Sequence, residues 1–233
     1  MTGIFDSGVG GLTALREYRR ICPSEDICYF ADRKNAPYGN KSREELMRLV
    51  GRDIEIMKRH GAEKILVACC TASAVLANMK EGADGSVYEI ITPTVREALS
   101  LTDGGRIGYI STAYTKGSFE FENRIYKIDH RVRVYGTVAS ELVGMAERGE
   151  CDGNLCSESL RIIERILAPL LRQRVDTVIL ACTHFTYFEK TVGDILGAKT
   201  VSAAHSGARA VAHSCGKNSL GEGRTVYIDE GDL

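Results

Sequence analysis

The sequence has no excess of charge of either sign and no long hydrophobic segment, and each absence excludes a class of function. It carries 30 Lys and Arg against 31 Asp and Glu, a formal net charge of -1. No overall charge therefore attracts the chain to nucleic acid or to an anionic membrane. The longest apolar runs, at 65–70 and 178–182, are far shorter than the roughly 18 residues of a membrane span. We expect a protein that binds neither nucleic acids nor membranes.

Signatures of secretion, zinc binding and disulfide scaffolds are also missing. The first residues lead directly into a strand-like segment, without the basic and apolar regions that begin a secreted precursor. The eight cysteines lack the C-x2-C spacing that recurs in zinc sites, and they are too sparse for a disulfide scaffold. We therefore expect reduced thiols in a cytoplasmic protein, and no metal site.

Neither of two common nucleotide-binding motifs is present. The P-loop motif is absent, and the glycine-rich segment DSGVGG at 6–11 lacks the third small residue of a dinucleotide fingerprint, because position 13 is Thr13. At a strand-to-helix turn such glycines permit a positive φ or a close backbone approach, and free N–H groups at the helix start attract an anion. The segment therefore predicts either a plain tight turn or an anion-binding turn.

Short apolar runs alternate with amphipathic segments along the whole chain, which predicts an α/β fold around a largely parallel sheet. A capping box at Ser42–Glu45 opens a helix with an apolar stripe from Leu46 to Met57. A second apolar stripe from Leu160 to Leu171 predicts another helix, with Pro169 near its end or at a kink. We expect both stripes in the core. The expected strands are 3–5, 27–30, 64–68, 88–91, 106–110, 133–136, 177–181 and 225–228.

A weak internal repeat indicates where chemistry would take place. Segments 64–71 and 177–183 both end a buried strand with Ala-Cys and carry a threonine close behind, and segments 3–8 and 107–112 both end in small hydroxylated residues. This predicts two β-α halves of about 100 residues, each with one cysteine at the end of a strand. Since ligands bind outside the carboxyl ends of strands in open α/β sheets, Cys69 and Cys182 are candidate site residues.

Several readings of these cysteines stay open. One cysteine at a strand end more often only packs, but a thiol at a helix N-terminus has its pKa lowered from about 8.5 and can act as a base. His184 is a candidate proton partner for Cys182. The adjacent Cys69 and Cys70 could instead form a labile disulfide.

The loop at 35–40 is either a surface turn or a shaped loop that presents the Tyr38 phenol and backbone N–H groups.

Four separated motifs, in the same order over nearly the whole chain, resemble the glutamate racemase family. They are FDSGVGGL at 5–12, YFAD with APYG at 29–39, ACCTAS at 68–73 and ACTH at 181–184. The resemblance implies two pseudo-symmetric α/β domains, each with a largely parallel central sheet flanked by helices, and an active site in the cleft between them. We expect the first domain at 1–94 plus 203–233 and the second at 95–202.

The resemblance also implies an activity and a set of site residues. The activity is cofactor-independent racemisation of L- and D-glutamate, which supplies D-glutamate for peptidoglycan. By position, Cys69 and Cys182 would be the two catalytic acid/bases, helped by Asp6, His184 and Glu147. The implied substrate-binding residues are Asp6, Ser7, Pro37, Tyr38, Gly39, Cys70, Thr71, Thr183 and His184. The resemblance leaves open whether the chain forms a homodimer.

The chain departs from the family pattern at three places. Cys70 stands where the family has a substrate-contacting Asn, for which Thr186 or His205 could compensate, and Phe185-Thr186 replaces Tyr-Pro. The chain is also shorter than typical members. These departures favour an altered substrate fit over a lost reaction type.

Two thiols from opposite halves suit racemisation, because one group must remove the α-proton and another must return a proton on the other face. The resulting carbanion needs oriented donors, for which Ser7, Thr71 and Thr183 are candidates. Three alternatives remain: a racemase of aspartate or another acidic amino acid, a thiol redox protein that uses Cys69 and Cys70, and a non-catalytic domain that binds a small ligand.

Overall fold

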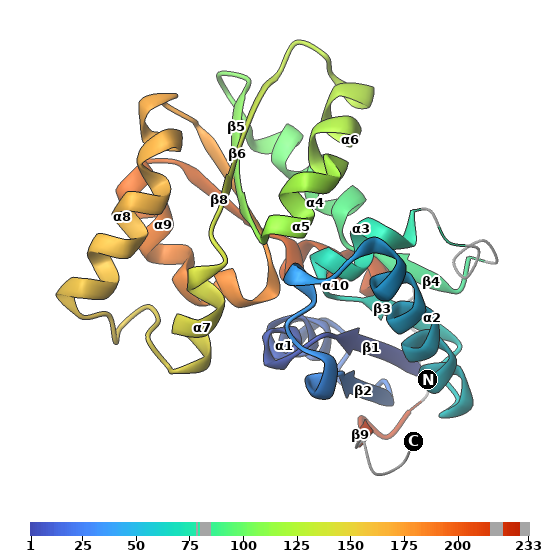
Figure 1. Cartoon of the computed structure of the whole chain (residues 1–233). Coiled ribbons are helices and arrows are strands. Elements are labelled where there is room, and N and C mark those ends of the chain that lie inside the picture. The colour runs from blue at the N-terminus through green and yellow to red at the C-terminus, as the bar shows by residue number, and fades with distance from the viewer. Residues whose placement is uncertain (78, 80–84, 215–220, 229–233) are drawn as a thin grey trace.

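The chain folds around two parallel sheets (Figure 1). The structure is a computed structural model that describes residues 1–77, 79, 85–214 and 221–228. The first sheet has the order β4-β3-β1-β2-β9 and the second β6-β5-β7-β8, with every neighbouring pair parallel. The strands of the first sheet are β1 (Thr2–Asp6), β2 (Ile27–Ala31), β3 (Lys64–Val67), β4 (Val87–Glu89) and β9 (Thr225–Ile228). Those of the second are β5 (Arg106–Ser111), β6 (Arg133–Val138), β7 (Thr177–Ala181) and β8 (Lys199–Ser202).

The two sheets repeat one topology. The order β2-β1-β3-β4 in the first half corresponds to β6-β5-β7-β8 in the second, so that β1 matches β5 and β3 matches β7. Within each half the chain therefore visits the strands in the same sequence, and the internal repeat has a structural counterpart. This confirms the expected fold class of two pseudo-symmetric α/β halves.

Helices flank both sheets. They are α1 (Leu12–Ile21), α2 (Arg43–Arg59), α3 (Cys70–Leu76), α4 (Ile91–Leu101), α5 (Ala113–Ser118), α6 (Glu120–Ile128), α7 (Glu141–Glu147), α8 (Ser157–Arg172), α9 (Glu189–Leu196) and α10 (Ala203–Ser214). Short 3-10 turns lie at η1 (Val9–Gly11), η2 (Arg33–Asn35), η3 (Tyr38–Asn40) and η4 (Thr183–Phe188). Among the helices in the described part of the chain, none combines the length and hydrophobicity that a membrane crossing requires.

One hydrophobic core joins the two halves. It contains residues of both sheets, such as Ile4 and Ile179, together with Tyr18 of α1, Val95 of α4 and Ala208 of α10. Separate cores cover the outer face of the first sheet under α2 and α3 and that of the second under α7, α8 and α9. Because α1, α4 and α10 pack between the sheets, the position of one sheet is fixed relative to the other. The expected domain boundary at 94–95 falls within α4 and stays a prediction.

The expected strands are present, with differences at β4 and β8. The strand expected at 88–91 ends at Glu89, because the Glu89 carboxylate accepts hydrogen bonds from the N–H groups of Ile91 and Thr92 and so starts α4. β8 was not predicted from the sequence; it is a short edge strand, KTVS, with a single apolar residue. Polar residues on an exposed edge give a weak strand signal.

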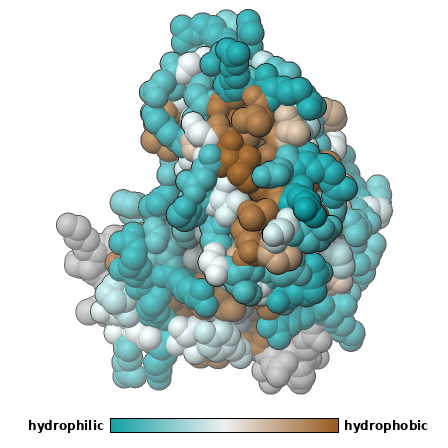
Figure 2. All heavy atoms as spheres, turned by 90° about the vertical axis from the view of Figure 1, so that its left-hand side faces the viewer, coloured by the Kyte–Doolittle hydropathy of each residue, from teal (hydrophilic) through white to brown (hydrophobic). Residues whose placement is uncertain are grey.

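The apolar stripe of α8 is only partly core. Ile163, Leu167 and Leu170 are buried, whereas Leu160 is 38% exposed and Leu171 is 50% exposed, so the expectation that the whole stripe is core is wrong at its two ends. The buried apolar residues of α8 belong to the core on the outer face of the second sheet, and Leu160 and Leu171 are not members of that core. Figure 2 shows the side of the molecule that carries α7, α8 and α9 in Figure 1; it is mainly hydrophilic, with one band of hydrophobic atoms.

The contrast within α8 gives a stability test. We expect Leu167→Ala to lower the free energy of unfolding by about 2–5 kcal/mol, because the side chain is fully buried and its removal leaves a cavity. Leu171→Ala is the matched control on the same helix and should change it by no more than about 0.5 kcal/mol. Urea unfolding measures both values, and equal losses would contradict this description of α8.

Candidate active site

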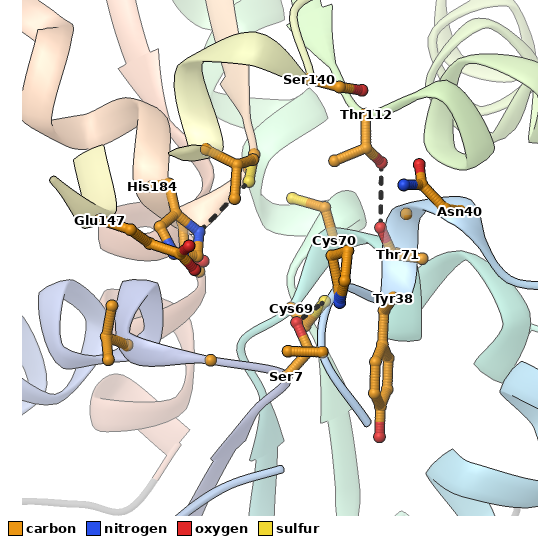
Figure 3. Close-up of a pocket in the computed structure, with 18 of the residues that line it drawn as sticks. Ser7, Tyr38, Asn40, Cys69, Cys70, Thr71, Thr112, Ser140, Glu147 and His184 are labelled. Carbon is orange, nitrogen blue, oxygen red and sulfur yellow. Dashed lines mark hydrogen bonds and ion pairs between the residues drawn. The ribbon is translucent and has the colours of Figure 1, made fainter. Parts of the chain in front are cut away.

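A cavity of about 690 Å³ lies at the carboxyl ends of strands from both sheets (Figure 3). Loops after β1, β2, β3, β5 and β7 contribute to its wall, as does α7. The predicted site residues that line it are Ser7, Pro37, Tyr38, Gly39, Cys69, Cys70, Thr71, Glu147, Cys182, Thr183 and His184. The fold therefore brings together residues that are far apart in sequence, at the edge where ligands of parallel sheets bind.

Cys69 and Cys182 occupy equivalent positions in the two halves. Cys69 lies between β3 and α3, and its Sγ is 3.3 Å from Ser7 Oγ. Cys182 lies between β7 and η4, and its Sγ is 3.8 Å from His184 Nδ1. Both thiols are buried but line the cavity. Figure 3 shows His184 and Glu147 on one side of the site and Ser7, Cys69 and Tyr38 on the other. One thiol from each half therefore faces the same space.

Burial raises the pKa of both thiols. It raises the pKa of Cys69 to about 11, with a further contribution from the nearby Asp6 carboxylate, and the N–H groups at the start of α3 offset only part of this rise. Burial also raises the pKa of Cys182 well above its ordinary value. The expectation of a lowered thiol pKa is therefore wrong for this state, because loss of water outweighs the helix N-terminus. Each thiol needs a proton acceptor before it can act as a base.

His184 and Glu147 connect Cys182 to the surface. His184 is buried, and its Nε2 lies 3.6 Å from Glu147 Oε1 at ion-pair distance. Glu147 is half exposed at the mouth of the cavity. The groups Cys182, His184 and Glu147 thus lie in a series from a buried thiol to solvent, in which His184 Nε2 has no hydrogen-bond partner within the described residues.

Asp6 lies behind the cavity wall. Its carboxyl group is buried and is not among the groups that line the cavity. Oδ1 accepts the N–H of Ser7 at 2.6 Å, whereas Oδ2 has no hydrogen-bond partner within the described residues. Burial raises the pKa of Asp6, although His184 opposes the rise. Asp6 is thus placed to help Cys69 through Ser7, and the structure shows no direct path from its carboxyl group to a bound substrate.

The glycine turn at 8–11 lies in close contact with the segment that follows β7. None of Gly8, Gly10 and Gly11 has a positive φ. A Cβ on Gly10 would lie 2.3 Å from Thr183 Oγ1 and 2.7 Å from His184 Nδ1. Only glycine therefore lets η1 of the first half pack directly on η4 of the second. The sequence predicted either a positive φ or a close backbone approach for these glycines, and the structure shows the close approach.

The Tyr38 phenol does not face the cavity. Its hydroxyl lies 2.6 Å from Asp32 and 2.6 Å from Asp53, and Figure 3 shows the ring pointing away from the other labelled residues. The expectation that this loop presents a phenol to the site is wrong, because two buried carboxyl groups hold the ring in the protein. The segment is not a simple surface turn either, since Tyr38 is buried while Pro37 and Gly39 line the wall.

Sequence reasoning missed several wall residues. Thr112 Oγ1 lies 3.0 Å from Thr71 Oγ1, which joins the end of β5 to α3 across the two halves. The repeat could have identified Thr112, because it follows β5 as Ser7 follows β1. Ser140 and Val143 of the α7 region carry no sequence signal that would place them here, and neither does Arg33. Within the described residues no cluster of three or more His, Cys, Asp or Glu side chains could hold a metal ion.

Comparison with known proteins identifies the family of this fold and site. The model of the Asp/Glu/hydantoin racemase family matches residues 24–211. The glutamate racemase of Desulforudis audaxviator (strain MP104C) is 36% identical over 200 residues, which cover 85% of this chain and 72% of the relative. The glutamate racemase of Gloeobacter violaceus is 36% identical over 198 residues, which cover 84% of this chain and 72% of the relative.

Solved structures agree with the sequence matches. Glutamate racemase isoform RacE1 from Bacillus anthracis superposes with a TM-score of 0.87 and 31% identity, covering 97% of this chain and 86% of that one. The glutamate racemase of Francisella tularensis, solved in complex with D-glutamate, superposes with a TM-score of 0.86 and 26% identity. The match covers 98% of this chain and 88% of that one. The chain belongs to the Asp/Glu/hydantoin racemase family. It is an amino-acid racemase.

The unequal thiol environments predict an order of alkylation. Cys156 is exposed, and hydrogen bonds from Ser159 lower its pKa, so among the described cysteines we expect it to react first with iodoacetamide near neutral pH. Cys69 and Cys182 should react slowly, with rates that rise as the pH approaches about 11 for Cys69, because a raised pKa keeps the thiolate fraction small at lower pH. Mass spectrometry of the peptides measures this order. Alkylation of Cys69 as fast as Cys156 at neutral pH would contradict the description.

Proposed function

We propose that this racemase interconverts L- and D-glutamate with Cys69 and Cys182 as its two acid/base groups, and that it supplies D-glutamate for peptidoglycan. The observation that carries the proposal is the pair of buried thiols at equivalent positions of two pseudo-symmetric halves, facing one cavity. The relatives named above as glutamate racemases support the choice of substrate.

In the proposed reaction one thiolate removes the α-proton and the opposite thiol returns a proton to the other face of the carbanion. The roles exchange when the substrate is the other enantiomer, with Cys69 acting on D-glutamate and Cys182 on L-glutamate. One proton leaves and one arrives, so the step needs no oxidant or reductant. A cofactor is not required by this scheme, and we expect chelators to have no effect. The location in a cytoplasm stays a prediction.

Because the pKa of each thiol is raised, neighbouring groups are needed to accept its proton. A thiol that must lose a proton in a water-poor cavity needs an acceptor nearby. For Cys182 the acceptor would be His184, with Glu147 connecting it to solvent. For Cys69 the route would run through Ser7 to the buried Asp6. These two routes differ chemically, which fits two thiols that serve opposite directions of the reaction.

Polar groups around the thiols would hold the substrate. The hydroxyls of Ser7, Thr71 and Thr112 lie on the wall and can donate hydrogen bonds to the carboxylate that carries charge in the carbanion. Arg33 is the only Lys or Arg among the described residues that line the cavity. One cation with several hydroxyls suits a small dicarboxylic amino acid.

A substrate panel in deuterated water tests the proposal. Incubation with L-glutamate should cause loss of the circular dichroism signal together with loss of the α-proton NMR signal, and both should be faster than with L-aspartate or neutral amino acids. Faster turnover of aspartate would overturn the substrate assignment. Binding of glutamate without exchange of its α-proton would overturn the reaction.

Removal of either thiol should stop the reaction. We expect Cys69→Ala and Cys182→Ala each to lower kcat at least about 100-fold, the lower end of the contribution of a positioned acid or base, with the fold unchanged by circular dichroism. Cys156→Ala is the matched control, because that thiol is exposed and does not line the cavity. A smaller loss in either cavity variant would refute the two-thiol assignment.

We expect Cys70 to make a weaker contact to the substrate than the Asn that the family has at this position. Its thiol lines the cavity, and a thiol is a poor hydrogen-bond donor compared with the amide of the family Asn. Thr186 and His205 line a different pocket, so neither compensates there. We expect Cys70→Asn to lower KM for glutamate by several-fold to about 100-fold and to preserve turnover. An unchanged or higher KM in steady-state kinetics would show that Cys70 only packs.

A further inference from the structure

A buried polar cluster lies behind the part of the cavity wall formed by Pro37, Tyr38, Gly39 and Asn40. Tyr38 Oη lies 2.6 Å from Asp32 Oδ2 and 2.6 Å from Asp53 Oδ2. Asp32 is 1% exposed and Asp53 is 0% exposed. The members come from three places in the chain, namely the end of β2, η3 and the middle of α2. The reaction proposed above uses none of these side chains.

The cluster has two carboxyl groups and one cation. Arg52 Nη2 lies 2.6 Å from Asp32 Oδ2 and 2.6 Å from Asp53 Oδ1. Asn35 Nδ2 donates to both oxygens of Asp32, at 2.9 and 3.1 Å. The charged and titratable groups that face Asp53 in the described part of the chain are Asp32, Tyr38 and Arg52. Two ionised carboxylates would therefore leave a buried negative charge without a partner.

The hydrogen bonds indicate where a proton would reside. The phenol of Tyr38 has one hydrogen, so it cannot donate to both carboxyl groups at once. Asp32 Oδ2 already receives Arg52 and Asn35, whereas Asp53 Oδ2 has Tyr38 as its only hydrogen-bond partner in the described residues. A proton on Asp53 Oδ2 completes a chain in which Asp53 donates to Tyr38 and Tyr38 donates to Asp32. Burial raises the pKa of Asp53 to about 6, in agreement with this arrangement.

The cluster anchors a wall of the cavity. In the segment 36–40, Tyr38 is the one buried residue, whereas Ala36, Pro37 and Asn40 are exposed. The Tyr38 side chain therefore attaches this segment to the domain beneath it, through its ring in the apolar core and its hydroxyl on Asp32 and Asp53. If the hydroxyl loses its partners, the backbone of Pro37 and Gly39 is free to shift by the small distances that weaken binding.

We propose that Asp53 is a positioning residue for substrate binding, which acts through Tyr38 by a shared proton and holds the segment 36–40 as one wall of the site. The proposal rests on the proposed function, because that function makes this wall a substrate contact. Asp53 itself does not line the cavity. Its substitution should therefore change KM more than kcat.

Three variants test the proposal through KM. We expect Asp53→Ala and Tyr38→Phe each to raise KM for glutamate about three- to ten-fold, the cost of a lost buried hydrogen bond, with a smaller change in kcat. Asp53→Asn should rescue binding, because its amide can accept from Arg52 and donate to Tyr38 at every pH. Asp176→Asn is the control, since Asp176 is a partly buried carboxylate before β7, at the opposite end of the sheet from the cavity.

The pH dependence separates this role from a merely structural one. Wild-type KM should rise as the pH increases through about 6, because ionised Asp53 no longer donates to Tyr38. Asp53→Asn should lack this rise. An equal rise in both proteins, or an unchanged KM in Asp53→Ala and Tyr38→Phe of an active enzyme, would overturn the proposal.

A stability measurement tests the shared proton without any activity. Asp53 should ionise near 3.8 in the unfolded chain and near 6 in the native protein. The native state therefore holds the proton more tightly, and wild type should lose stability relative to Asp53→Asn as the pH rises from about 4 to above 6. Urea unfolding at several pH values measures this difference. A constant difference refutes the shared proton, whereas an inactive wild type with the expected pH dependence refutes only the proposed function.

Discussion

The packing of two parallel sheets around one central core is the constraint on which the site depends. Helices α1, α4 and α10 contribute to a single apolar cluster that includes residues of both sheets. Their burial fixes the two sets of strand ends relative to each other, and the glycine turn lies so close to Thr183 that a Cβ on Gly10 would be 2.3 Å from Thr183 Oγ1. Catalytic geometry with a tolerance of about 1 Å requires such a rigid frame.

The same packing also makes ionisation of the two buried thiols unfavourable. Enclosing the thiols excludes water, which in the proposed reaction would strengthen hydrogen bonds to the carbanion. It also raises the pKa of Cys69 and Cys182, so that neither thiol is a ready base by itself. In the proposed reaction, the buried carboxyl of Asp6 and the pair of His184 and Glu147 are therefore as necessary as the thiols, because they would accept the protons that the thiols release.

The sequence predicted the features that depend on local pattern. Strand ends, the capping box at Ser42 and the duplicated Ala-Cys segments are local, and the duplicated segments identified Cys69 and Cys182; most of the other predicted wall residues were implied by the resemblance to glutamate racemases. Features set by tertiary packing could not be predicted. The direction of the Tyr38 hydroxyl depends on Asp53, fifteen residues away on α2. The thiol pKa depends on how completely the two halves exclude water, and the exposure of Leu171 depends on which face of α8 packs on the second sheet.

The isotopic composition of the first product tests the central claim of two opposed thiols most directly. L-glutamate with protium at its α-carbon is converted in deuterated water, and the reaction is stopped after a small fraction has reacted. If two different groups remove and return the proton, the D-glutamate formed carries deuterium at the α-carbon while the unreacted L-glutamate keeps its protium. D-glutamate that retains the substrate's own hydrogen would show that a single group performs both transfers, and would contradict the account.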